Sequence, residues 1–445
     1  MLVEFSVENY RSIQERQTLS MVASEDLGVG AFRETPLLEN NSFPMPTGEE
    51  LRLLASAAIY GPNASGKSNL VRAMQSLKKI VMDSATKVQA GERLSYIQPF
   101  LLDAEWSKKP TCFEVIFIDE EIRYEYQVSL DQRRVYEERL IAHVKGRSQI
   151  WFSRQYDPED PELQQDDGYE WSFPKLKGEK KRIQKFVRSN SLFLSHAAQN
   201  NHSQLTKVFN WFVNNMNSID PDFSIPYTAE RCMSDPEFRE AVVKLIIEAD
   251  VGISDINVDT KPMPGEMRAV FFDRLREFSF EIQRPDIIED FDKDDLEVIQ
   301  VLTVHKSSNS EEPVYFNMND ESEGTKRFFE MAGPWLDVLQ EGEVLIVDEL
   351  DRSMHPVLAR SLVKMFNDPE INKKNAQLIF TTHDTTLLDA EIFHREQVWF
   401  TEKDRNMTNL YSLLEFQPRE DESLQRGYLL GRYGAIPFIG GLNIE

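Results

Sequence analysis

The sequence predicts an α/β fold in which a sheet of buried strands carries a phosphate-binding loop. Leu51–Tyr60 is a nearly continuous small apolar run that ends directly in a glycine-rich loop followed by a helical pattern, the order that such a loop requires. Two later apolar segments, 342–349 and 377–382, each end in polar side chains, as strands of an open α/β sheet do. Residues 113–140 alternate apolar and polar, which predicts antiparallel hairpins beside this sheet.

Length and composition indicate a large globular protein. With 445 residues the chain exceeds one ordinary core, so two lobes or one domain with a large insertion are expected. Its two cysteines cannot form a disulfide framework, and neither a signal peptide nor a stretch of about 20 apolar residues is present, so we expect a soluble cytoplasmic protein with no membrane contact. The net charge of −25 disfavours broad coating of nucleic acid, although a local basic patch is compatible with it.

The remaining elements are expected in chain order. Residues 1–23 predict two strands and 24–50 a surface loop, and Leu70, Met74, Leu77 and Val81 recur at helical spacing after the glycine loop. Seven Lys/Arg lie within 175–188, where a helix is expected to start. The apolar face of 205–216 predicts a second helix, and Asp235-Pro236 predicts the N-cap and first turn of a third. Further strands are expected over 267–272, 278–282, 298–304 and 314–318, with an acidic loop at 286–295.

These elements suggest three segments. Residues 1–150 would form a first lobe with the glycine loop and the antiparallel strands, 151–265 a mostly helical insertion, and 266–445 a second lobe.

The glycine loop matches the P-loop pattern in full. It comprises Gly61, Pro62, Asn63, Ala64, Ser65, Gly66, Lys67 and Ser68, followed by Asn69. In such a loop, backbone N–H groups and a helix N-terminus surround the phosphates, Lys67 would bridge the terminal phosphates, and Ser68 would coordinate Mg²⁺. The loop therefore predicts binding of ATP with Mg²⁺.

Two later strands would deliver the hydrolytic groups to the same sheet edge. Asp348 and Glu349 follow an apolar strand, so Asp348 is expected in the Mg²⁺ shell and Glu349 is expected to orient or deprotonate the attacking water. His383 follows the next strand and would contact the γ-phosphate or that water. An apolar strand that ends in Asp-Glu is common and is weak evidence by itself. It becomes strong evidence for a nucleotide site because the chain also carries the P-loop.

Three further segments fit the order of an ABC ATPase. Glu321–Lys326 precedes a helix 24 residues before Asp348 and resembles the ABC signature motif, whose serine and glycine, here Ser322 and Gly324, complete the ATP site of an opposite protomer. Gln98 lies where a Q-loop would contact the metal, although a plain strand-entry glutamine explains it equally well. Asp351 and Ser353 occupy the D-loop position.

Together with Asn9–Ser12, these motifs resemble the SMC/RecF-like branch of ABC ATPases over nearly the whole chain, and more narrowly the RloA-type ATPases related to OLD and PARIS defence systems. The resemblance implies an ABC-ATPase-like fold, Arg11 among the nucleotide ligands, and a homodimer or higher homo-oligomer with composite ATP sites. It further implies a role in anti-phage defence with a separate effector, a TOPRIM-type nuclease. The Ser-Glu-Gly-Thr signature departs from the transporter Ser-Gly-Gly-Gln, and the span between the two lobes is too short for the long coiled-coil arm of SMC proteins.

Two alternatives remain open. A RecF-like DNA-binding ATPase in repair or maintenance would use the basic cluster at 175–188, and a nearly inactive scaffold would oligomerise through the helices at 205–249.

Overall fold

The structure is a computed structural model that describes residues 1–23, 37, 40–48, 51–157, 159–160, 168–219, 226–249, 252–281, 296–307, 312–416 and 423–437, with the backbone alone for 275–281. The chain forms two compact units: a large unit, Met1–Pro221 with Val338–Glu445, and an inserted unit, Asp222–Asp337. These limits differ from the expected 150 and 265, because residues 151–219 supply strands and helices to the large unit. No helix within the described ranges has the length and apolar content of a membrane span.

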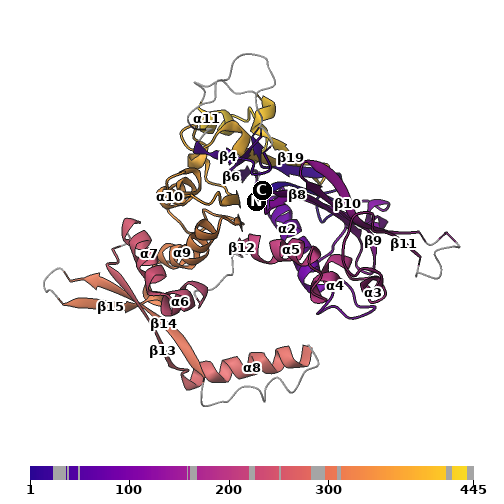
Figure 1. Ribbon diagram of the computed structural model, residues 1–445. Coiled ribbons are helices and arrows are strands. Elements are labelled where there is room, and N and C mark those ends of the chain that lie inside the picture. The colour runs from indigo at the N-terminus through magenta and orange to yellow at the C-terminus, as the bar shows by residue number, and fades with distance from the viewer. Residues whose placement is uncertain are drawn as a thin grey trace, which may run out of the picture. The chain divides into compact units, whose positions relative to one another are not determined.

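A six-stranded sheet in the order β12-β16-β17-β6-β18-β19 forms the centre of the large unit (Figure 1). Its strands are β6 (Ser56–Tyr60), β12 (Met216–Ile219), β16 (Val344–Val347), β17 (Gln377–Thr381), β18 (Val398–Asp404) and β19 (Met407–Ser412). All neighbours are parallel except β18 and β19, and β6, β16 and β17 are buried at every residue. The predicted α/β fold with a mixed sheet is therefore confirmed.

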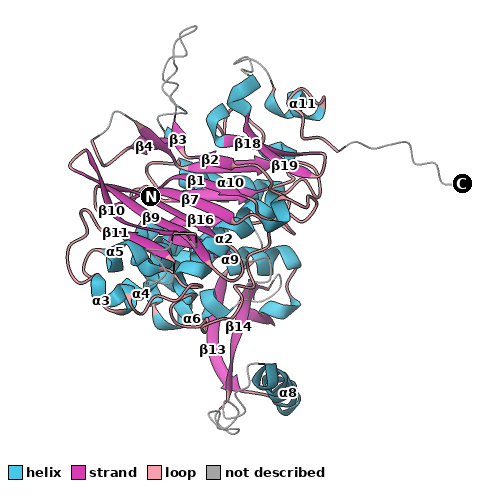
Figure 2. Ribbon diagram, turned by 90° about the vertical axis from the view of Figure 1, so that its right-hand side faces the viewer, coloured by secondary structure: helices cyan, strands magenta, loops and turns pink. Residues whose placement is uncertain are grey.

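A seven-stranded antiparallel sheet, β11-β10-β9-β8-β7-β1-β2, is the second layer (Figure 2). Its strands are β1 (Leu2–Glu8), β2 (Gln17–Ser20), β7 (Thr111–Asp119), β8 (Ile122–Leu130), β9 (Val135–Val144), β10 (Arg147–Tyr156) and β11 (Tyr169–Ser172). Helix α2 (Lys67–Asp83) shares one apolar core with strands of both sheets, and the predicted face of Leu70, Met74, Leu77 and Val81 is buried. The antiparallel hairpins expected over 113–140 are confirmed.

The single strand expected over 51–60 is wrong. The run contains β5 (Arg52–Leu54) and β6, which belong to different sheets, since β5 pairs with β3 (Val22–Ala23) and β4 (Ser42–Pro44). Ala55 lies between them, and its N–H donates to Asn41 O at 2.8 Å. Small apolar residues fit both buried environments, so composition alone did not locate the break.

The segment from 181 to 219 also departs from expectation. Only Lys181–Gln184 of the basic cluster is helical (α3), and after α4 (Phe193–Gln199) the helix predicted over 205–216 ends early. Helix α5 (Leu205–Asn210) passes into a π-turn (Trp211–Asn215), and Met216 begins β12. Pairing of β12 with the buried strand β16 outweighs the helical spacing of the apolar residues.

The inserted unit contains helices and a three-stranded antiparallel sheet, β13-β14-β15. Its elements are α6 (Pro226–Ser234), α7 (Pro236–Glu248), β13 (Asp255–Pro262), α8 (Gly265–Glu281), β14 (Glu297–Lys306) and β15 (Pro313–Asn317). Asp235 caps α7 by accepting from the N–H groups of Glu237 and Phe238, as predicted. Helix α9 (Glu323–Glu341) begins in this unit and ends in the large unit.

The strands expected over 267–272 and 278–282 are wrong, because helix α8 covers the first and residues 278–281 of the second, whose last residue lies outside the described residues. Short apolar runs separated by charges fit either period, so periodicity could not decide between strand and helix. The acidic loop at 286–295 lies outside the described residues.

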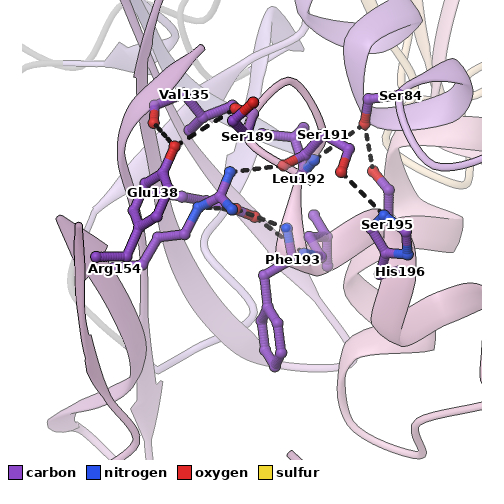
Figure 3. Close-up of polar contacts among 12 residues, drawn as sticks. Ser84, Val135, Glu138, Arg154, Ser189, Ser191, Leu192, Phe193, Ser195 and His196 are labelled. Carbon is purple, nitrogen blue, oxygen red and sulfur yellow. Dashed lines mark hydrogen bonds and ion pairs between the residues drawn. The ribbon is translucent and has the colours of Figure 1, made fainter. Parts of the chain in front are cut away.

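A buried ion pair joins the antiparallel sheet to α4 (Figure 3). Glu138 Oε2 of β9 lies 3.3 Å from Arg154 Nε of β10, and both side chains are fully buried. The Glu138 carboxylate also accepts from the N–H groups of Phe193 and Leu194 at 2.7 and 2.9 Å, and Arg154 donates to Ser191 O at 2.6 Å. Neighbouring strands and the start of α4 are thereby tied together inside the core.

The far end of α2 is fixed by polar contacts as well. Arg188 donates to the carbonyl oxygens of Ser84 and Val88 at 2.9 and 2.7 Å, and Ser195 Oγ donates to Val81 O at 2.5 Å. Cations near a helix C-terminus complement its unpaired carbonyls. The helix that begins at the P-loop is thus held firmly at its other end.

Candidate nucleotide-binding site

The P-loop connects β6 to α2 through a backbone that needs its glycines. Gly61, Ala64 and Gly66 have positive φ angles of 151°, 63° and 115°. Gly66 is the N-cap of α2 and supplies no side-chain cap, so the first N–H groups of the helix face the loop without a capping side chain. Such an arrangement of N–H groups and helix dipole suits a phosphate.

Strands β18 and β19 pack closely against the P-loop. A Cβ on Gly61 would overlap Thr401 of β18, and a Cβ on Gly66 would overlap the Thr408 side chain of β19. The glycines are therefore required by close approach as well as by their φ angles.

A chain of hydroxyl contacts supports the loop from behind. Ser65 Oγ lies 2.6 Å from Thr401 Oγ1, and Thr408 Oγ1 donates to Ser65 O at 2.8 Å. Ser12 Oγ lies 2.7 Å from Thr408 Oγ1 and 2.6 Å from Asn69 Nδ2, which donates to it. Sequence reasoning missed Thr401 and Thr408, because two threonines on late strands carry no motif.

Lys67 is buried in the loop, with 5% of its surface exposed. Its Nζ donates to Gly61 O at 2.8 Å and to Pro62 O at 3.2 Å. Burial lowers the pKa of Lys67 to about 8, against the opposing effect of the carboxylates of Asp348, Glu349 and Asp351. The amine therefore lies within electrostatic reach of the groups at the end of β16.

Asp348 and Glu349 follow β16 directly and are fixed by the end of β17. Thr381 Oγ1 donates to Asp348 Oδ1 at 2.6 Å and accepts from the N–H of Glu349 at 2.8 Å. Asp348 is 8% exposed, and Glu349 has a positive φ of 54°, an uncommon conformation that a turn at a functional site can hold. Sequence reasoning also missed Thr381, which positions both of these acidic residues.

His383 follows β17 at the same edge. The backbone N–H of His383 donates to the Asp351 carboxylate, at 3.2 and 3.3 Å to the two oxygens. Burial and then the charge of Lys67 lower the pKa of His383, whereas Asp351, Glu349 and Asp348 raise it. The structure thus brings Lys67, Glu349 and His383 together, as expected for carboxyl ends of parallel strands.

Arg11 and Gln98 are held next to each other through the backbone. The N–H of Arg11 donates to Gln98 O at 2.7 Å, and Arg11 Nε donates to the Tyr10 hydroxyl at 3.2 Å. The Gln98 side chain is exposed. Gln98 does not enter a strand, since β7 begins only at Thr111.

Ser322 and Gly324 lie at the start of α9, in the inserted unit. Ser322 Oγ accepts from the N–H of Thr325 at 3.1 Å and so acts as an N-cap. Glu321 accepts from Thr303 Oγ1 at 2.5 Å and contacts His305 Nε2 at 2.8 Å. Ser322 itself is exposed, so this helix end is accessible.

The oxygen donors near the P-loop fit Mg²⁺. Asp348 and Ser68 offer a carboxylate and a hydroxyl, which are hard ligands. No cluster of three or more His, Cys, Asp or Glu suited to a metal occurs in the part of the chain that the structure describes. Mg²⁺ at nucleotide sites uses few protein ligands and completes its shell with phosphate oxygens and water, so this small donor set is appropriate.

Known proteins resemble the chain at the level of family and fold. No curated protein sequence matches it. The crystal structure of the SmcHead bound to the C-winged helix domain of ScpA is 11% identical, with a TM-score of 0.40 over 92% of this chain and 97% of that chain. The SMC head domain from Thermotoga maritima is 10% identical, with a TM-score of 0.38 over 92% and 98%.

At these TM-scores the fold assignment rests on the sheet topology and P-loop of this chain. A protein-family model matches residues 56–389, well over half of the sequence and the whole span from β6 to the segment after His383. The chain therefore belongs to the ATPase family described as "AAA domain, putative AbiEii toxin, Type IV TA system".

Proposed function

We propose that this chain is a Mg²⁺-dependent ATPase that closes as a homodimer around ATP and reopens after hydrolysis. The observation that carries the proposal is the meeting of Lys67, Asp348, Glu349 and His383 at one sheet edge, beside a complete P-loop. Such an edge holds both phosphate ligands and hydrolytic groups.

Each residue has a role that its position supports. Backbone N–H groups of the P-loop and the Lys67 ammonium hold the phosphates, and Ser68 and Asp348 hold the metal. Mg²⁺, when bound, neutralises charge that develops on the phosphates. Glu349 orients the attacking water and accepts its proton, His383 contacts the γ-phosphate, and Thr381 keeps Asp348 and the Glu349 backbone in place.

The second half of each ATP site would come from another copy of the chain. Ser322 and Gly324 stand at the accessible N-terminus of a 19-residue helix, where N–H groups and the helix dipole favour a phosphate. Arg11, in the loop between β1 and β2, and Gln98, in the loop before β7, would approach the nucleotide and metal. Closure around ATP then makes assembly depend on nucleotide.

The biological role we propose is anti-phage defence in the cytoplasm, in which ATP-driven dimers or higher oligomers control a separate effector nuclease. The resemblance to RloA-type ATPases supports this role, as does the family description, which names a toxin of a type IV TA system.

The test uses Glu349→Gln with Glu370→Gln as a matched control, since Glu370 is an exposed glutamate outside the site. Glu349→Gln should bind ATP, lose turnover by at least about 100-fold, and accumulate as a dimer with Mg-ATP by light scattering. Glu370→Gln should match the wild type. Unchanged turnover, or a strict monomer in every nucleotide state, would contradict the proposal.

A second candidate function is DNA binding by the basic cluster. Five of its cations, at 175, 177, 181, 182 and 185, are exposed, and the side chains of these five form no ion pair within the described residues. Lys180 and Arg188 instead donate to backbone carbonyls. DNA affinity that falls steeply with salt and disappears on Lys181→Glu/Lys185→Glu would establish this function, whereas no binding at low salt would eliminate it.

A further inference from the structure

Strand β15 forms an edge of the inserted unit's sheet that is unusually open. It pairs with β14 and is the last strand in the order β13-β14-β15. Val314, Tyr315 and Phe316 are 40%, 52% and 45% exposed. Because successive residues of a strand point to opposite faces, both faces of the edge present large apolar side chains.

The two edges of this sheet differ in chemistry. Strand β13 carries Asp255, Asp259 and Lys261 and ends in Pro262, the charges and proline that protect an edge from further pairing. Strand β15, Pro-Val-Tyr-Phe-Asn, has no charge and a proline only at its first position. An exposed, apolar and uncharged edge strand is a template for another strand.

We propose that β15 pairs antiparallel with β15 of a second copy of this chain, about a two-fold axis at Tyr315, to give a dimer interface that needs no nucleotide. In this register Tyr315 lies opposite Tyr315 and Val314 opposite Phe316. Aromatic and β-branched residues are favourable cross-strand partners, and a self-complementary edge closes as a dimer.

The local charge at this edge permits a second copy of the chain as the occupant. The chain carries a net charge of −25, so most of its surfaces repel a copy of itself. In the proposed register the first acidic residue before the strand, Glu312, falls opposite Met318, so no two carboxylates face each other across the strand pair. The neutral edge is therefore a place where two copies meet without like-charge repulsion.

This interface is separate from the ATP sandwich and is tested without nucleotide. The full chain carrying Lys67→Ala, which removes the phosphate-binding amine, should shift from single-chain to two-chain mass by sedimentation as its concentration rises to about 100 μM, the behaviour of a weak interface of less than about 1,200 Å². Failure of Glu349→Gln to assemble with ATP would count against the proposed function and leave this result unaffected.

Charged variants at the axis make the test specific. Tyr315→Lys and Tyr315→Glu, each in the Lys67→Ala chain, should stay monomeric because like charges meet across the two-fold axis, and their 1:1 mixture should regain the two-chain mass. Recovery in the mixture also shows that both variants are folded. Asn257→Lys, an exposed position on β13, should dimerise as the parent does.

Three outcomes would overturn the inference. They are a parent that stays monomeric throughout this range, a mixture of the two Tyr315 variants that stays monomeric, and a mass that grows beyond two chains without limit. The last result would mean a head-to-tail contact in place of a closed two-fold pair.

Discussion

Replacing Glu138 by alanine should destabilise the large unit more than any single surface change. The Glu138 carboxylate is fully buried against Arg154 and accepts from the N–H groups of Phe193 and Leu194 (Figure 3). It also accepts from the Tyr126 hydroxyl at 3.1 Å. Its removal leaves the Arg154 charge without its partner and three buried donors without an acceptor. Breaking a buried pair in this way costs about 3–5 kcal/mol, a range that already includes much of the cost of the lost hydrogen bonds.

We therefore expect the free energy of unfolding to fall by about 4 kcal/mol for Glu138→Ala and by a similar amount for Arg154→Met. The double variant Glu138→Leu/Arg154→Met should lose much less than the sum, because no charge is then left buried. Urea unfolding followed by tryptophan fluorescence measures this, since Trp151 and Trp171 lie on β10 and β11.

The exposed pair of Arg16 and Glu114 is the control, because Arg16 is half exposed and such pairs contribute about 0–1 kcal/mol. Glu114→Ala should shift the unfolding midpoint little. A loss below about 1 kcal/mol for Glu138→Ala, or strict additivity in the double variant, would refute the reasoning that the pair is a desolvated, mutually dependent unit.

Three other perturbations address the site and its surroundings. Gly66→Ala should weaken ATP binding by more than about tenfold in a titration, because the new Cβ overlaps Thr408 and the φ of 115° is strained for alanine; binding within twofold of wild type would contradict this. Burial lowers the pKa of Lys67 to about 8, so the free protein loses above this pH the proton that phosphate binding needs. ATP affinity measured in Glu349→Gln should therefore be constant below pH 8 and fall about tenfold per pH unit above it. A flat affinity profile up to about pH 9.5 would exclude this role of Lys67. Burial lowers the pKa of His196 from 6.5 to about 4, so the unfolded chain takes up a proton first and stability should fall as the pH drops from 6.5 to 4, with a smaller fall in His196→Gln.

Much of the site was predictable because its motifs are local. The P-loop is eight consecutive residues, and Asp348, Glu349 and His383 follow apolar runs that became β16 and β17. Their meeting at one edge follows from parallel pairing alone, since all carboxyl ends of parallel strands lie on one side. The errors occurred where a short apolar run fits both helical and strand periodicity, as in α8. They also occurred where one apolar run contributes strands to two different sheets, as on either side of Ala55.

The sequence by itself predicted an α/β fold with a complete P-loop, and it predicted a metal ligand and a hydrolytic glutamate at the end of a later strand. Only the tertiary structure revealed the groups that hold these residues in place. Ser12 and Thr408 are 396 positions apart and meet behind the P-loop, and Thr381 joins Asp348 to the Glu349 backbone. The physical reason is that a motif is recognised from neighbours in the chain, whereas such hydrogen bonds depend on strand order and register, which distant segments decide when they pack.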